Sequence, residues 1–132
     1  MNHQEKKHVI WMFKNGASGY WIENYVKGFT SEKRMLLSKQ EMLGKWNDIL
    51  VNVNWTKKYD GFFKVWVNNK LAYEFKGQTK SKGVKTYYKF GIYRSWISKY
   101  KSYHKGKEVP TQVVYFDEVR AGKTKEKVIQ NK

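Results

Sequence analysis

Residues 61–69 read Gly-Phe-Phe-Lys-Val-Trp-Val-Asn-Asn, and this stretch decides the fold. An apolar residue recurs at every second position, namely Phe63, Val65 and Val67, while polar or larger side chains stand between them. A period of two is typical of a β-strand that buries one face. The Asn68-Asn69-Lys70 sequence that follows favours a tight turn. The stretch therefore predicts a strand and a turn, with residues 71–75 returning as the next strand.

The preceding segment, residues 46–55, shows the same alternation. It places Ile49, Val51, Val53 and Trp55 on one face and Asp48, Asn52 and Asn54 on the other. This pattern predicts a second half-buried strand. If the two strands pair in simple register, Asn52 and Asn54 lie on the same face as Trp66.

Further towards the N-terminus, Val9–Phe13 and Gly19–Val26 are short and rich in aromatic and β-branched residues. We expect a hairpin here with its turn at Lys14-Asn15-Gly16. The next segment, Thr30–Leu43, mixes apolar and polar residues without a clear period, so a short helix and an irregular excursion between strands both fit.

Towards the C-terminus, residues 85–94 alternate again. Thr86, Tyr88, Phe90 and Ile92 are the expected core side, and Lys85, Tyr87, Lys89, Gly91 and Tyr93 form the opposite face. A basic loop over residues 96–109 and a last strand over residues 111–120 are expected to follow. The pattern predicts an all-β antiparallel sandwich or jelly roll. We expect one domain over residues 1–120 and a charged, frayed tail over residues 121–132.

Composition limits the kind of partner. The chain has 132 residues, 27 Lys and Arg against 11 Asp and Glu, and a formal net charge of +16. Such a charge attracts polyanions, but it does not distinguish acidic glycan, nucleic acid and a membrane surface. No cysteine is present, which excludes disulfides and thiolate sites. No apolar run approaches the ~20 residues of a membrane span, and no signal peptide is visible, so the compartment stays open.

Four motifs together resemble the jelly-roll polysaccharide lyases of the heparin lyase I and glucuronan lyase type, which have a concanavalin A-like fold. They are Trp46-Asn47-Asp48, the stretch 61–69 quoted above, Tyr88-Lys89-Phe90-Gly91-Ile92-Tyr93-Arg94, and residues 111–120, Thr-Gln-Val-Val-Tyr-Phe-Asp-Glu-Val-Arg. The resemblance covers the C-terminal half of the family's fold, and Asn69 stands where the family usually has glycine.

The resemblance implies cleavage of a uronate-containing polysaccharide by β-elimination, without a cofactor. In that reaction the sugar carboxylate is neutralised, a base removes the proton at carbon 5, and an acid protonates the leaving oxygen. By motif position, Tyr93 matches the family's catalytic tyrosine and Lys89 its substrate-contacting lysine. We expect the remaining members of the polar faces to bind substrate: Lys64, Trp66, Asn52, Asn54, Tyr87 and Lys85.

The chain departs from the family in two respects. The family's catalytic histidine has no aligned counterpart among His3, His8 and His104, and the chain is shorter than a usual member. Either strands before Val9 are missing, or this is a reduced form that binds without cleaving. Self-association would cover the edges of such a shortened sandwich. No carboxylate cluster suited to a metal is apparent in the sequence.

Two other functions remain open from the sequence. A non-catalytic carbohydrate-binding module would need the same basic, aromatic face but no turnover. Binding of single-stranded nucleic acid would also use basic residues interleaved with aromatic ones. The lyase-like motifs argue against nucleic acid, and competition between polyuronate and oligonucleotide would distinguish the two partners.

Overall fold

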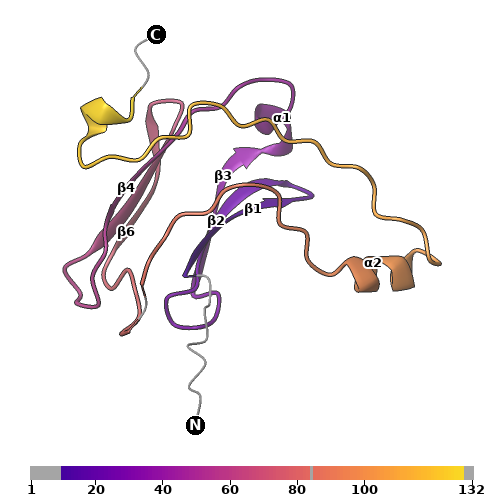
Figure 1. Cartoon of the computed structure of the whole chain (residues 1–132), viewed down its shortest axis with the longest axis horizontal. Helices are drawn as coiled ribbons and strands as arrows, with labels where there is room; N and C mark the ends of the chain where they lie inside the picture. The colour runs from indigo at the N-terminus through magenta and orange to yellow at the C-terminus, as the bar shows by residue number, and fades with distance from the viewer. Residues whose placement is uncertain (1–9, 84, 130–132) are drawn as a thin grey trace. The chain divides into compact units, whose positions relative to one another are not determined.

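The computed structural model describes residues 10–83 and 85–129. The chain forms two compact units, Met1–Thr86 and Tyr87–Lys132. The described strands all belong to the first unit, which also contains one short helix (Figure 1). Its elements are β1 (Trp11–Gly16), β2 (Gly19–Asn24), β3 (Glu32–Ser38), α1 (Lys39–Met42), β4 (Ile49–Asn54), β5 (Phe62–Val67) and β6 (Lys70–Lys76).

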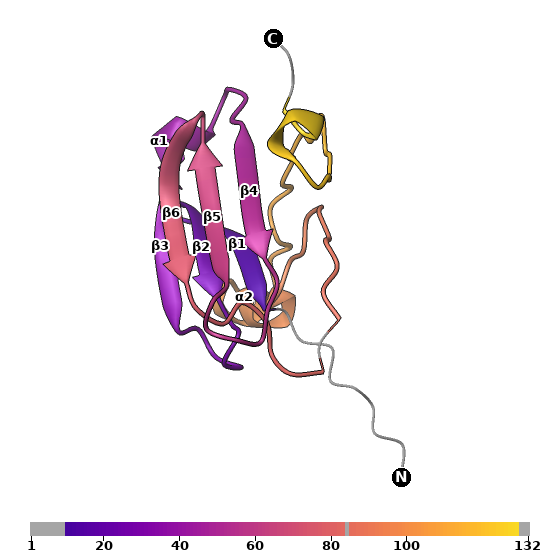
Figure 2. The same cartoon turned by 90° about the vertical axis from the view of Figure 1, so that its left-hand side faces the viewer.

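The strands of the first unit make two antiparallel sheets of three strands each. Their orders are β1-β2-β3 and β4-β5-β6, so each sheet is a meander of consecutive strands. Figure 2 shows the β4-β5-β6 sheet in front of the β1-β2-β3 sheet, as two stacked layers. The unit is therefore an antiparallel sandwich, and the predicted all-β class is confirmed.

Strand β5 is the central strand of its sheet and shows the predicted alternation. Phe63, Val65 and Val67 are buried, and the residues between them are only half-buried. Val51 of β4 lies opposite Val65 and packs against the same core. The period of two in the sequence correctly predicted which face of this sheet is buried.

The turn between β5 and β6 depends on two consecutive asparagines. Asn68 and Asn69 have φ angles of 49° and 66°, which place both residues in the left-handed region that a two-residue hairpin of the primed type requires. Asparagine tolerates this region better than most residues, so Asn69 can replace the usual glycine. The Asn68 side chain also accepts a hydrogen bond from the Asp48 amide at 2.9 Å, which ties the turn to the start of β4.

The N-terminal hairpin is confirmed, but its predicted turn is wrong by two residues. Strands β1 and β2 pair from Trp11 with Asn24 to Gly16 with Gly19, so Ala17 and Ser18 form the turn. Lys14, Asn15 and Gly16 continue the strand because each has a partner on β2. Turn-prone residues did not stop the strand where pairing could continue.

The segment over residues 30–43 contains both a strand and a helix. Strand β3 pairs with β2 along its length, and α1 follows as a single turn. Ser38 caps α1, since its hydroxyl accepts from the Glu41 amide while the Glu41 carboxylate accepts from the Ser38 amide. This reciprocal capping ends the strand and begins the helix at one residue.

The core lies between the two sheets of the first unit. It contains Ile22, Leu37, Phe63, Val65, Val67 and Tyr73. The Trp11 ring stacks on Phe63 with centroids 4.1 Å apart, and its indole N–H donates to the Thr79 carbonyl at 2.9 Å. Thr79 is fully buried, and its hydroxyl donates to the Asn54 carbonyl at 2.6 Å. The loop after β6 is thereby tied to the end of β4.

The second unit contains α2 (Ile97–Tyr103) and the 3-10 helix η1 (Lys125–Lys127). The basic loop expected over residues 96–109 therefore includes a seven-residue helix. Lys101 of α2 forms an ion pair with Glu108 at 2.7 Å. η1 lies in the segment expected to be a charged tail. The single domain over residues 1–120 stays a prediction.

The strands predicted over residues 85–94 and 111–120 are wrong for this structure, because neither segment contains a described strand. Gly91 has a φ of 129° and Glu118 a φ of 52°, and each interrupts the extended backbone that a strand needs. Three of the four expected core residues of the first segment are exposed instead, namely Tyr88 at 69%, Phe90 at 59% and Ile92 at 48%. Alternation identifies a buried face only when the segment finds strand partners.

Within the described parts of the chain, no helix has both the length and the apolar character needed to cross a membrane.

Candidate functional site

The outer face of the β4-β5-β6 sheet brings together four of the predicted site residues. The register places Asn52 opposite Lys64, Leu50 opposite Trp66, and Asn54 opposite Phe62. Asn52, Asn54, Lys64 and Trp66 therefore share the face that points away from the core, as simple register predicted. The two asparagines are exposed, and Lys64 and Trp66 are half-buried.

Lys64 already has an ionic partner on this face. Its ammonium lies 3.4 Å from a carboxylate oxygen of Glu74, and Lys76 lies 3.5 Å from the other oxygen. The Lys64 ammonium is also 5.3 Å from the centroid of the Phe62 ring. Two cations share one carboxylate, so this group retains one net positive charge that could contact an acidic sugar.

The same face carries groups suited to neutral parts of a sugar. The Asn52 and Asn54 amides can donate and accept hydrogen bonds to hydroxyls. Trp66 has Leu50 and Leu71 as its cross-strand neighbours, so an apolar row runs across the three strands at this point. An apolar ring face complements the C–H face of a pyranose.

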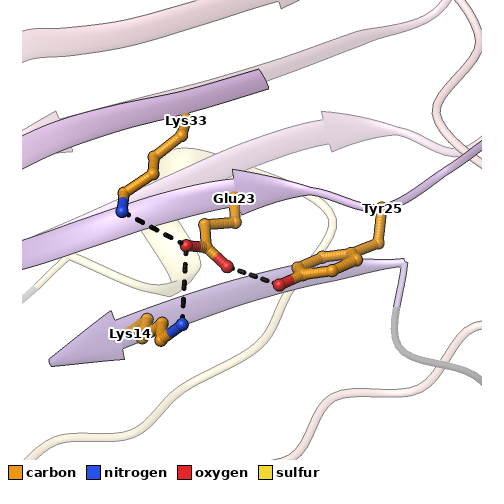
Figure 3. Close-up of polar contacts among 4 residues, drawn as sticks. All are labelled: Lys14, Glu23, Tyr25 and Lys33. Carbon is orange, nitrogen blue, oxygen red and sulfur yellow. Dashed lines mark hydrogen bonds and ion pairs between the residues drawn. The ribbon is translucent and has the colours of Figure 1, made fainter. Parts of the chain in front are cut away.

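The outer face of the β1-β2-β3 sheet carries a charged cluster that the sequence did not reveal. Glu23 of β2 has a side chain only 3% exposed, and one carboxylate oxygen lies 3.8 Å from both the Lys14 and Lys33 ammonium groups. Its other oxygen accepts a hydrogen bond from the Tyr25 hydroxyl at 2.6 Å. Figure 3 shows the three partners converging on this carboxylate. Glu23 thereby anchors side chains from β1, from β3 and from just beyond the end of β2.

Both lysines of this cluster remain open to solvent. The side chains of Lys14 and Lys33 are 52% and 48% exposed. The Lys33 ammonium also lies 4.5 Å from the centroid of the Trp21 ring, within cation–π range. The sequence contains little signal for this cluster. Glu23 lies directly opposite Lys33 and diagonally opposite Lys14, and both relations can be seen only when the strand register is known.

The second unit holds Tyr87, Lys89 and Tyr93 in one irregular segment. Tyr93 is 86% exposed, and the Lys89 ammonium lies 5.1 Å from the centroid of the Tyr87 ring. Lys85 is exposed and belongs to the first unit. The predicted residues thus fall into separate groups, one on the β4-β5-β6 sheet of the first unit and one in the second unit.

Two further residues of the second unit have contacts of a structural kind. Arg94, which belongs to the lyase-like motif, donates to the Pro110 carbonyl at 2.8 Å and so ties together two parts of the unit. The His104 ring stacks on Tyr100 with centroids 4.1 Å apart, one turn along α2. The other two histidines, His3 and His8, lie outside the described residues.

Not every tyrosine can act on a substrate. Tyr73 is buried at 3% exposure in the core, and this burial raises the pKa of its hydroxyl above the ordinary value. Tyr25 and Tyr93 differ from it because Tyr25 lies against the Glu23 carboxylate and Tyr93 lies in solvent. Of Tyr25, Tyr73 and Tyr93, therefore, only Tyr25 and Tyr93 fit a role at a surface site.

Metal chemistry has no evident location in the described residues. Over residues 10–83 and 85–129, no three His, Cys, Asp or Glu side chains lie close enough together to hold a metal ion. The charged groups described above are mainly cationic, which suits an anionic ligand.

A comparison of the chain with known protein families gives a match. A family model described as polysaccharide lyase matches residues 10–120, which is most of the chain. The matched range includes the Glu23 cluster, the polar face of β4-β5-β6, and Lys89 with Tyr93. No curated protein and no solved structure matches the chain. By the family match, the chain belongs to the polysaccharide lyase family.

Proposed function

We propose that this protein binds a uronate-containing polysaccharide and cleaves it by β-elimination, as a lyase of the heparin lyase I and glucuronan lyase type. The family match over residues 10–120 carries the proposal, because it includes both Lys89 and Tyr93. The net charge of +16 supports an acidic substrate, since it attracts polyanions over long range.

In the proposed reaction, Tyr93 and Lys89 act on the same sugar. Lys89 neutralises the uronate carboxylate, which makes the proton at carbon 5 easier to remove. Tyr93, as phenolate, takes that proton, and the electron pair left at carbon 5 forms a double bond to carbon 4. The bond from carbon 4 to the glycosidic oxygen breaks, and the departing oxygen takes a proton from the tyrosine. No water is consumed.

A second candidate function is binding without cleavage. The observation that favours it is the 86% exposure of Tyr93, on a segment without strand pairing. Proton transfer is most effective in a site that excludes water and holds the reacting groups still. The polar face with Asn52, Asn54, Lys64 and Trp66 would serve a binding module equally well.

The test is the ultraviolet absorbance of the new double bond, which is conjugated to the carboxylate, with glucuronan, alginate and heparin as separate substrates. We expect signal from the wild type, and loss of it in Tyr93→Phe and in Lys89→Gln. The matched controls are Tyr103→Phe and Lys99→Gln, which change exposed residues of the same unit. Binding of a polyuronate without any signal would select the binding-module function. Preference for an oligonucleotide over every polyuronate would overturn both functions.

A further inference from the structure

The Glu23 cluster combines a buried anion with exposed cations, and this combination needs an explanation. The Glu23 side chain is only 3% exposed, so its carboxylate loses most of its hydration and requires close partners. The two ammonium groups and the Tyr25 hydroxyl supply them. The lysines themselves are about half exposed, so they keep donors that Glu23 does not use.

The positions of the two lysines follow from their shared partner. Both ammonium groups lie 3.8 Å from the same Glu23 oxygen, so they cannot be further from each other than twice that distance. Lysine side chains are flexible, and two free lysines on the strands at either side of β2 would repel each other and spread apart. Glu23 attracts both ammonium groups and so brings two positive charges together, with one net positive charge left over.

From this geometry we propose that Lys14 and Lys33 form a subsite for a uronate carboxylate of the polysaccharide, and that Glu23 is the residue that positions them. The inference rests on the proposed function and extends it to the outer face of the β1-β2-β3 sheet. Trp21 lies beside the subsite, and the contact between its ring and the Lys33 ammonium, 4.5 Å from the ring centroid, helps to hold that lysine in place. Tyr25 acts through Glu23, by holding the carboxylate in place.

Charge complementarity identifies the occupant. Each lysine can direct a spare donor at an incoming carboxylate, and such charge-assisted hydrogen bonds are stronger than neutral ones. A polysaccharide with one carboxylate per sugar presents these groups at regular intervals, whereas a neutral glycan offers none. We therefore expect this subsite to distinguish polyuronate from a neutral glucan.

The experiment is calorimetric titration of the full chain with polyglucuronate, with a neutral glucan as comparison. In the double variant Lys14→Gln/Lys33→Gln we expect roughly tenfold weaker binding, as for the loss of a charge-assisted hydrogen bond. The matched control is Lys57→Gln/Lys58→Gln, which removes the same charge from exposed residues between β4 and β5. A loss no larger in the first variant than in the control would overturn the subsite and leave the proposed function standing.

Glu23→Gln tests the positioning role by the sign of its effect. The amide oxygen can still accept from Tyr25, but the lysines lose their ionic partner. If Glu23 only reduces attraction for a polyanion, its neutralisation strengthens binding. If Glu23 positions the lysines, binding weakens although the protein has gained net positive charge. Equal or tighter binding by Glu23→Gln would overturn the positioning role. Thermal unfolding and near-ultraviolet circular dichroism of each variant verify that it has kept the fold. If the wild type does not bind polyuronate at all, both the proposed function and the subsite are overturned.

Discussion

The outer faces of the two sheets carry the same ionic arrangement in different surroundings. On each face one glutamate lies between two lysines: Glu23 with Lys14 and Lys33, and Glu74 with Lys64 and Lys76. The Glu23 side chain is 3% exposed and also accepts from a tyrosine, whereas the Glu74 side chain is 34% exposed. Similar ion pairs should therefore differ in energy and in rigidity, because burial decides how strongly water competes.

Removal of the Glu23 carboxylate should give the largest effect. We expect Glu23→Ala to lower the free energy of unfolding by about 2 kcal/mol, since it leaves the Tyr25 hydroxyl and two cations without their common partner. Urea denaturation of Glu23→Ala and of the wild type under identical conditions measures this difference in the free energy of unfolding. A loss as small as that of an exposed ion pair would mean that burial does not distinguish the two faces.

Tyr25→Phe tests the hydrogen bond that only the Glu23 cluster has. The expected loss is about 1 kcal/mol, because the carboxylate keeps its lysines but loses the donor at 2.6 Å. The control is Tyr59→Phe, which removes the hydroxyl of a tyrosine that is 86% exposed. Equal stability of the two variants in denaturant would show that this hydroxyl contributes nothing to the cluster.

Glu74→Ala should change stability less than either of these. Exposed ion pairs contribute up to about 1 kcal/mol, and Glu74 is open enough for water to replace it. The measurement is again urea denaturation. A loss of stability equal to that of Glu23→Ala would also contradict the distinction between the two faces.

Salt dependence gives the smallest but most specific difference. At about 1 M salt the screening length falls to roughly 3 Å, which weakens exposed pairs far more than buried ones. We expect the effect of Glu74→Ala to disappear in high salt and most of the effect of Glu23→Ala to remain. Parallel denaturation series at low and high sodium chloride would show this, and equal salt sensitivity of the two variants would be the contrary result.

Sequence periodicity was sufficient to predict a strand and its buried face where the segment packs on a core and pairs with neighbouring strands. The stretch from Phe62 to Val67 alternates cleanly, and its strand, its buried face and the asparagine turn after it were all predictable. Together with the alternation over residues 46–55, this stretch also placed Asn52, Asn54, Lys64 and Trp66 on one face, because side chains on a strand can point in only two directions. Local rules sufficed for these residues because β4 and β5 pair without a bulge, so each strand's own alternation also assigns the shared face.

The same alternation failed over residues 85–94. It predicted a strand with Tyr88 and Phe90 in the core, yet these rings are exposed and the backbone turns at Gly91. Alternation describes what a strand would bury, and it contains no information about whether a neighbouring strand is present to pair with it. The placement of Lys89 and Tyr93 on a sheet face failed for the same reason.

By itself, the sequence determined the all-β class, the hairpin around Asn68-Asn69, the strongly basic character and the family-like motifs, since these depend on composition and short-range pattern. Only the tertiary structure decided that Glu23 is a buried anion between Lys14 and Lys33. These residues are separated along the chain and meet only through the pairing of β2 with β1 and with β3, and a bulge between Tyr20 and Trp21 shifts the register of β2 with β3. A register is a property of paired backbones, so no pattern within one strand could have shown it.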